Sequence, residues 1–431
     1  MLETMSMLKI HDDSRYLHLM SPLTPNIMNA RVAIASFAAA SAGLSIALIS
    51  LSKLFLMIAV VVVWLWSTQK FAENVSLKNL WTPRLILVIL AVFAGSLLWT
   101  TAPQDQAMEA IGKYGKFLVI PALLLLIRCR QEALLVLAIF LGFQVISLLS
   151  SWLLFFHLPV VWASGKHAKE LFAVFATYLD QSIMSAVVAA LFWHLKSLAP
   201  NRTLFYLAIA MSLLALGSVF VVFVGRTGQL VGLAMISLAV FWALPRRFRL
   251  AAVAVPPLIA LLAYGVGAIP QRFLTAESEA SAFLEKPAAV TSTGVRLYFW
   301  KSSIEAMAQN PLTGSGAGSW TTEYNRVERS KNHNFEALKA ASNPHQEFFL
   351  WGVQLGVVGI LLLLAFLGAV MKDFLKMDTA IARAGQSVLA ALVVSCLFNS
   401  SLYDAHIGSF FCISLGVLLA FGNHGGTTPK Q

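Results

Sequence analysis

The apolar residues of this 431-residue chain gather in long runs that short polar segments separate. A helix that crosses a bilayer needs about 20 mostly apolar residues, and most of these runs approach that length. The pattern therefore predicts an all-α integral membrane protein with about twelve transmembrane helices. The predicted spans are residues 32–51, 54–68, 84–101, 115–128, 133–156, 181–198, 203–224, 228–244, 250–269, 347–371, 382–401 and 406–422. Two of them, 54–68 and 115–128, are short, and Pro121 favours a kinked or partial crossing in the second.

Composition supports the membrane assignment, since 58% of the residues are hydrophobic and only 12% are charged. A soluble chain carries about 25% charged residues, so these charges are too few to cover a water-facing surface. The net charge of +11 could indicate a nucleic-acid partner, but the basic residues lie between apolar segments and form no stripe with interleaved aromatic residues. The positive charge therefore indicates membrane topology, and we expect no nucleic-acid partner.

Lysine and arginine in the short connections are concentrated on one side of the predicted bundle. That side carries Lys9, Arg15, Arg31, Lys70, Lys78, Arg84, Arg128, Arg130, Lys196, Arg202, Arg246, Arg247, Arg249, Lys372, Lys376, Arg383 and Lys430. The other side carries Lys53, Lys113, Lys116, Lys166, Lys169 and Arg226. The richer side should face the cytoplasm, which places both termini inside and residues 157–180 outside.

The chain then divides into five parts. They are a cytoplasmic tail (1–31), transmembrane helices 1–9 (32–269), a large external loop (270–346), transmembrane helices 10–12 (347–422) and a second cytoplasmic tail (423–431). The external loop is far longer than a connection requires, and long loops on a rigid scaffold usually carry function. Its stretches around 294–309 and 320–340 have helical character.

Two arginines in unusual settings are candidates for anion binding. Arg226 lies on a glycine-flanked turn, between Gly225 and Thr227-Gly228, where the chain meets the external surface. It is either an arginine that reaches the lipid headgroups or a bidentate ligand for phosphate oxygens. Arg296 lies in the first turns of a predicted amphipathic helix, where backbone donors and a guanidinium together favour an anion. The alternative for Arg296 is an ordinary solvated charge.

His345 stands where the external loop re-enters the membrane, next to Pro344. Histidine titrates near neutrality and can take a proton from a hydroxyl, although an interfacial histidine that only forms hydrogen bonds is the alternative. Neither a nucleotide-binding Walker motif nor an Asp-x-Asp or His-Glu-x-x-His metal motif is present in the sequence. The glycine-rich stretch from Gly314 to Gly318 does not follow a strand, which favours a tight turn over a phosphate loop.

These residues together resemble the bacterial O-antigen ligase family. His345-Gln346, followed after nine residues by Gly356-x-x-Gly359, resembles that family's signature H-[NSQ]-x9-G-x-x-G. Arg296, followed by Trp300 and the stretch Asn310–Gly316, resembles the superfamily's shared segment, and Arg226 matches a further arginine before the long loop. The resemblance implies a fold similar to the polytopic glycosyltransferases of the GT-C class.

The resemblance also implies a reaction. Such enzymes transfer a preassembled glycan from undecaprenyl pyrophosphate to a sugar hydroxyl of lipid A–core oligosaccharide, at the periplasmic face of the inner membrane, in lipopolysaccharide biosynthesis. It implies no cofactor and no metal. His345 would be catalytic, Arg226 and Arg296 would bind the pyrophosphate, and Gln346, Asp404, Gly356 and Gly359 would support them. We expect the two glycines to let a neighbouring helix pack closely against the helix that presents His345. The alternatives are an O-antigen polymerase, a protein O-oligosaccharyltransferase and, from another class, a transporter or lipid flippase.

Overall fold

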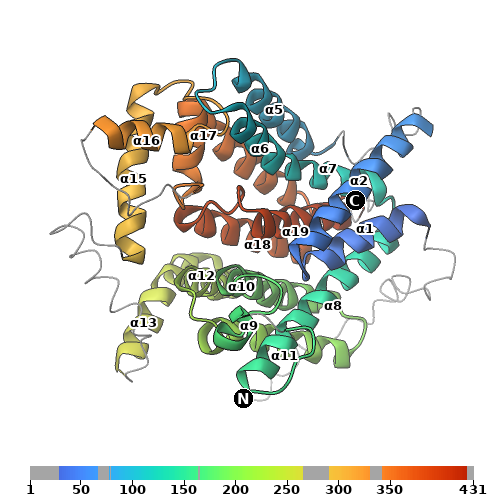
Figure 1. The fold of residues 1–431 in the computed structure, drawn as a ribbon. Coiled ribbons are helices and arrows are strands. Elements are labelled where there is room, and N and C mark those ends of the chain that lie inside the picture. Colours follow the sequence, from blue (N-terminus) through green and yellow to red (C-terminus); the bar gives the residue numbers. More distant parts are fainter. Residues whose placement is uncertain are drawn as a thin grey trace.

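The computed structural model describes residues 29–66, 77, 79–163, 166–265, 291–330 and 342–424. Within these ranges every regular element is a helix, and the helices pack into a bundle (Figure 1). The α-helices are α1 (Ala30–Ser41), α2 (Ile46–Trp66), α5 (Trp81–Gly95), α6 (Gln104–Tyr114), α7 (Val119–Leu126), α8 (Arg130–Phe155), α9 (Lys166–Leu171), α10 (Tyr178–Leu195), α11 (Arg202–Gly217), α12 (Arg226–Ala243), α13 (Val255–Gly265), α15 (Ser292–Gln309), α16 (Trp320–Ser330), α17 (Glu347–Phe374), α18 (Thr379–Phe398) and α19 (Ala405–Asn423). Short 3-10 segments cover Ser96–Leu98, Gly115–Leu118, Lys196–Leu198 and Arg246–Ala254, and a π-helical turn covers Ser218–Val222.

The described part of the chain contains 8 helices that are long and apolar enough to cross a membrane. Each predicted span falls on helical residues. Four of them fall wholly or partly on shorter or less apolar helices, namely 32–51, 115–128, 181–198 and 250–269. The last of these runs beyond the described residues. The all-helical membrane class is therefore confirmed, whereas the count of twelve spans and the GT-C likeness stay predictions. In the external loop, α15 begins two residues before the predicted stretch 294–309, and α16 begins at the predicted residue, Trp320.

The first chain reversal lies in a different place from the one predicted at residues 52 and 53. Helix α1 ends at Ser41, and α2 begins at Ile46 and continues through Lys53. The turn lies at Gly43, where a Cβ atom would come within 2.9 Å of the Phe143 backbone, so only glycine lets the chain pass. Lys53 therefore lies inside a helix. Our expectation that it belongs to a short connection is wrong.

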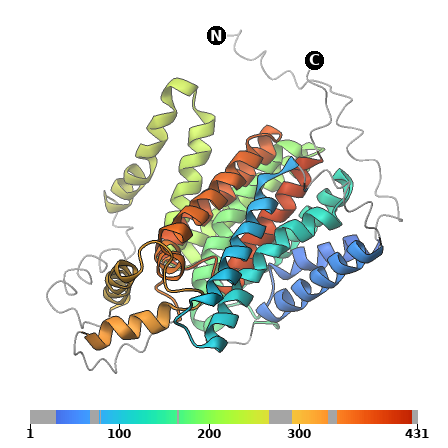
Figure 2. The same cartoon turned by 90° about the horizontal axis from the view of Figure 1, so that it is seen from above.

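Helix α19 is the centre of the bundle. Within the most apolar stretch of α19, 94% of the residues are buried, against 22% for α2, which lies at the periphery. Helices α7, α8 and α18 pack around α19, α10 packs against α11, α12 and α18, and α17 packs against α5 and α18. Helices α15 and α16 pack on α17 at one end of the bundle, away from the C-terminus (Figures 1 and 2). We call this end the site end.

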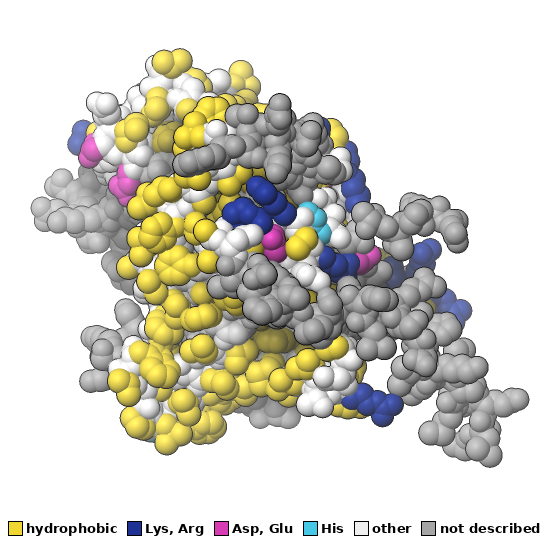
Figure 3. Space-filling view, turned by 90° about the vertical axis from the view of Figure 1, so that its right-hand side faces the viewer, with side chains coloured by type: hydrophobic (Ala, Val, Ile, Leu, Met, Phe, Trp, Pro, Cys, Tyr) yellow, Lys and Arg dark blue, Asp and Glu magenta, His cyan; other side chains and the backbone are white. Residues whose placement is uncertain are grey.

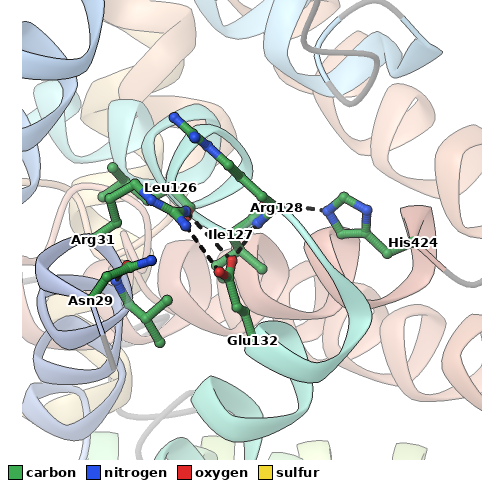
Figure 4. Close-up of polar contacts among 8 residues, drawn as sticks. Asn29, Arg31, Leu126, Ile127, Arg128, Glu132 and His424 are labelled. Carbon is green, nitrogen blue, oxygen red and sulfur yellow. Dashed lines mark hydrogen bonds and ion pairs between the residues drawn. The ribbon is translucent and has the colours of Figure 1, made fainter. Parts of the chain in front are cut away.

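The opposite end is fastened by polar contacts between α1, the start of α8 and the end of α19 (Figure 4). Arg31 at the start of α1 forms an ion pair with Glu132 at 3.0 Å. Glu132 also accepts a hydrogen bond from the backbone amide of Arg128 at 2.7 Å. The His424 ring, just after α19, lies 3.2 Å from the carbonyl oxygen of Ile127. These contacts join three helices whose sequences are hundreds of residues apart.

Further contacts gather basic residues at the same opposite end. Arg130 forms an ion pair with Asp378 at 3.5 Å, and Arg383 lies over the Trp242 ring at 6.0 Å. The sequence predicts Arg31, Arg130 and Arg383 on the side richer in positive charge, and their contacts lie together at this end.

A face seen from one side of the bundle is mostly hydrophobic, with a compact group of charged and histidine side chains in its midst (Figure 3).

Candidate active site

The candidate site is built first around His345, whose backbone adopts a left-handed conformation with φ of +54°. This conformation is uncommon for a residue other than glycine and is found disproportionately where function requires strain. Its neighbours hold it there. Asn343 accepts a hydrogen bond from the His345 amide at 2.9 Å, and Gln346 caps α17 by accepting from the Phe349 amide at 2.6 Å. The imidazole is thus presented just before the helix begins.

The next residue, Glu347, fixes the turn 399–404 that precedes α19. Glu347 is fully buried, and its carboxylate accepts hydrogen bonds from the backbone amides of Leu402 at 2.8 Å and Tyr403 at 3.3 Å. Lys116, also buried, donates to the carbonyl oxygens of Tyr403 and Asp404 from the other side. Two buried side chains, Glu347 and Lys116, therefore hold this turn and fix the position of Asp404.

Arg296 and Arg226 come from two helices that meet at the site end. Thr291 caps α15 by accepting from the Gly294 amide at 3.0 Å, and Arg296 follows one turn later. Arg226 is the first residue of α12, three residues after the π-helical turn ends at Val222. Its guanidinium donates to the Thr293 hydroxyl at 3.3 Å. Because Thr293 and Arg296 are three residues apart on one helix, both arginines lie on the same side of α15.

A cavity of about 630 Å³ opens between these elements at the site end. Arg296, His345 and Asp404 line it together, although 108 positions separate the first from the last. Its remaining wall comes from the segment 173–180, from Asn399, from the start of α19, from Ile46 at the start of α2 and from Ala168 in α9. Arg226 is not part of the lining, but its hydrogen bond to Thr293 joins it to α15, which carries Arg296. The structure thus brings three of the predicted residues together and places Arg226 beside them.

Asp180, in the first turn of α10, lines the same cavity and was not among the candidates from sequence. Burial, together with the nearby Asp404 carboxylate, raises its pKa to about 7. Burial likewise raises the pKa of Asp404, against the opposing effect of two lysines. By contrast, burial lowers the pKa of His345, and the positive charge of Arg296 adds to that shift. The cavity therefore has a basic part, around Arg296 and His345, and an acidic part, around Asp180 and Asp404.

Gly356 has a different role from the one that we expected. We predicted that it would let a neighbouring helix pack closely, yet it breaks α17, with φ of 61° and ψ of −149°. A Cβ atom there would lie 2.5 Å from the carbonyl group of Leu312. The amides after the break, Val357 and Val358, instead donate to the carbonyl oxygens of Pro311 and Leu312 at 2.8 and 3.3 Å. Gly356 thus lets the segment around Pro311 and Leu312 dock against α17 at the break.

Gly359 packs against its own helix across this break, since a Cβ atom there would lie 2.5 Å from the carbonyl oxygen of Trp351. Both glycines of the signature therefore shape α17 itself, and the expected packing of a neighbouring helix on them is wrong.

The glycine-rich stretch after the docked residues is a turn and not a phosphate loop. Its three glycines, Gly314, Gly316 and Gly318, all have positive φ, and their neighbours crowd them closely. The amides of residues 314–319 all donate to protein acceptors, among them the Val353 and Gln354 carbonyl groups at 2.9 and 2.8 Å. With every donor committed, none points at a ligand, and the tight-turn interpretation is confirmed.

Sequence reasoning missed three residues that shape the site, Asp180, Glu347 and Lys116. Glu347 and Lys116 are charged residues at the ends of apolar runs, and an ionisable residue at such a place is a functional signal in itself. Asp180 carries the same signal one residue before the predicted span 181–198. Among the described residues, no group of three or more histidine, cysteine, aspartate or glutamate side chains is arranged to hold a metal ion.

These features define an all-helical, multi-pass membrane protein with a charged cavity at one end of its bundle. Residues 219–364 match the sequence model of the family described as O-Antigen ligase, which supports the resemblance found in the sequence. No curated protein matches the chain. The matched segment contains Arg226, Arg296 and His345, together with both signature glycines. Asp180 and Asp404 lie outside it.

Proposed function

We propose that this protein is an O-antigen ligase, a glycosyltransferase that moves a preassembled glycan from undecaprenyl pyrophosphate to a sugar hydroxyl of lipid A–core oligosaccharide. One observation carries the proposal. Arg296 and His345 line a single cavity at one end of a membrane bundle, with Arg226 joined to the same helix through Thr293. This is the pairing of anion-binding and proton-accepting groups that transfer from a lipid pyrophosphate requires.

The arginines act on the leaving group. As the acceptor oxygen bonds to the anomeric carbon, the bond from that carbon to the pyrophosphate oxygen breaks, and negative charge grows on the pyrophosphate. Guanidinium groups already in place stabilise that charge without reorganisation, and the loss of one such donor typically costs about 100- to 1,000-fold in rate. Arg296 would meet the pyrophosphate in the cavity, and Arg226 would meet it from the adjoining start of α12.

His345 would take the proton that the acceptor hydroxyl releases. The imidazole must be neutral to do so, and both burial and Arg296 favour the neutral ring by lowering its pKa. A sugar hydroxyl is a poor acid, so the proton moves late, as the bond to the leaving group is already breaking. A positioned base of this kind contributes about 100- to 10,000-fold.

The orientation in the membrane is part of the proposal. The end opposite the site holds Arg31, Arg130 and Arg383, and residues of this kind favour the cytoplasmic side. The cavity would then face the periplasm from the inner membrane of a bacterial cell, with residues 270–346 on the same side. Donor and acceptor are both lipid-linked there, so both would approach the site laterally from the bilayer.

Reconstitution tests the proposal. Purified protein in liposomes would receive lipid-linked glycan and lipid A–core, without nucleotide or added metal. A ligase joins the glycan to lipid A–core. Growth of the glycan on its own polyprenyl carrier, with lipid A–core unchanged, would instead identify a polymerase, and transfer to neither substrate would refute a glycosyltransferase of this class.

A further inference from the structure

Two carboxylates stand on the cavity wall away from the arginine and histidine. Asp180 comes from the first turn of α10 and Asp404 from the turn before α19, so two separate elements deliver them to one place. They are close enough that the charge of Asp404 acts on Asp180. Among the described residues, neither side chain takes part in an ion pair at 4 Å or less. Both residues are partly exposed and line the cavity, so a molecule that enters the cavity meets them.

Hydrogen bonds of Thr177 and Gln181 fix the backbone around Asp180. Thr177 caps α10 by accepting from the Asp180 amide at 3.2 Å. Gln181, which is buried, accepts from the Val174 amide at 2.9 Å and donates to the Ser151 hydroxyl on α8 at 2.7 Å. These bonds tie the cavity-lining segment 173–177 to the interior of the bundle. Asp180 is therefore as firmly positioned as Asp404, which Lys116 and Glu347 hold through its turn.

We propose that Asp180, together with Asp404, forms the subsite for the acceptor and binds ring hydroxyl groups of the acceptor sugar. The inference rests on the proposed function and deepens it. The pyrophosphate is repelled by the carboxylates and attracted to Arg296, so the donor occupies the basic part of the cavity. A neutral polyol has no such repulsion, and its hydroxyl groups donate well to carboxylate oxygens.

This division of the cavity orients the reaction. The acceptor, held by hydroxyl groups that do not react, presents one further hydroxyl toward His345, and the proton of that hydroxyl passes to the imidazole as its oxygen bonds to the anomeric carbon. The carboxylates neither gain nor lose a bond in this step. Asp180 is accordingly a binding residue, and its removal should act on acceptor affinity more than on the rate at saturation.

Kinetics of Asp180→Asn in the reconstituted system test the proposal. The KM for lipid A–core should rise about 10- to 100-fold, the usual consequence of losing hydrogen bonds to a charged group, while the KM for the lipid-linked donor stays within about twofold. Asp180→Glu, which keeps the charge, should recover part of the acceptor affinity. Glu170→Gln, on the exposed surface of α9, is the matched control and should leave both KM values unchanged.

Three results would overturn the subsite. They are an acceptor KM within about twofold of wild type in Asp180→Asn, an equal rise in both KM values, or a divalent-cation requirement of the wild type that Asp180→Asn alters. Failure of the proposed function is a separate result, because the wild type would then transfer nothing to lipid A–core. In that case direct binding of purified core oligosaccharide tests the subsite by itself, because the proposal requires weaker binding to Asp180→Asn than to Glu170→Gln.

Discussion

The break of α17 at Gly356 makes a sharp stability prediction. The backbone angles there are essentially restricted to glycine, so Gly356→Ala should add about 1–3 kcal/mol of strain. The new methyl group would also lie 2.5 Å from the Leu312 carbonyl group, which must move away. That movement disrupts the hydrogen bonds from Val357 and Val358, each worth about 0.5–1.5 kcal/mol. Together these effects destabilise the protein by about 2–6 kcal/mol.

Gly368 in the same helix provides the matched control. No atom lies within 4 Å of a Cβ atom at that position, and its backbone is helical. Gly368→Ala should therefore leave stability unchanged or raise it by up to about 1 kcal/mol. Thermal unfolding of the purified protein in detergent measures both variants, and we expect Gly356→Ala to melt about 5 °C or more below Gly368→Ala. Equal melting temperatures would show that the loop does not depend on the break.

The remaining predictions concern catalysis and topology. Arg226→Lys and Arg296→Lys keep a charge but lose the planar fork, so both should impair use of the donor at unchanged protein levels, and a fully active alanine variant would remove that arginine from the site. Transfer should survive EDTA, and activity lost with chelator and restored by Mg²⁺ or Mn²⁺ would contradict the role of the arginines. The rate at saturation should fall in acid with a midpoint below pH 6.5, because burial and Arg296 lower the pKa of His345. The other titratable groups that line the cavity are Asp180, Asp404 and His406. His345→Gln should lose about two orders of magnitude while still binding donor, and near-wild-type turnover would leave only a positional role. A cysteine at exposed Ser330 should react with a reagent that cannot cross the membrane only when that reagent is added from the periplasmic side; Ser278, at which the same labelling is expected, lies outside the described residues.

Most of the fold could be predicted because a membrane helix has a length that the sequence displays directly. Helices α8, α12, α18 and α19 lie close to their predicted spans. The errors arose where the apolar signal does not mark a boundary. Residues 32–68 are apolar almost throughout, so hydropathy alone could not show that the chain reverses at Gly43 and not near Lys53. That reversal depends on a close approach to Phe143, a contact about 100 positions away in the sequence.

The site could be predicted in part for a related reason. His345, Arg226 and Arg296 lie within one continuous segment whose spacing carries the family resemblance. Asp180 is far from that segment, and only the packing of α10 against α12 and α18 brings it to the cavity. The signature drew attention to Gly356, but the sequence does not distinguish a glycine that permits close helix packing from one that breaks a helix. Their difference lies in the backbone angles.

The docking of residues 310–319 into α17 also limits how this protein can be re-engineered. The same stretch contacts residues 96–107, where Thr101 donates to the Ser315 carbonyl oxygen at 2.9 Å and a side chain at Gly316 would collide with Thr100. A chimera that exchanged only the loop between related chains would place residues 310–319 of one chain against backbone of the other chain at residues 96–107 and in α17. The contacts between them would then no longer match. We expect the exchanged loop to fold in its new host only when 96–107, 310–319 and 347–359 are exchanged together, as one module assembled from three distant stretches of sequence.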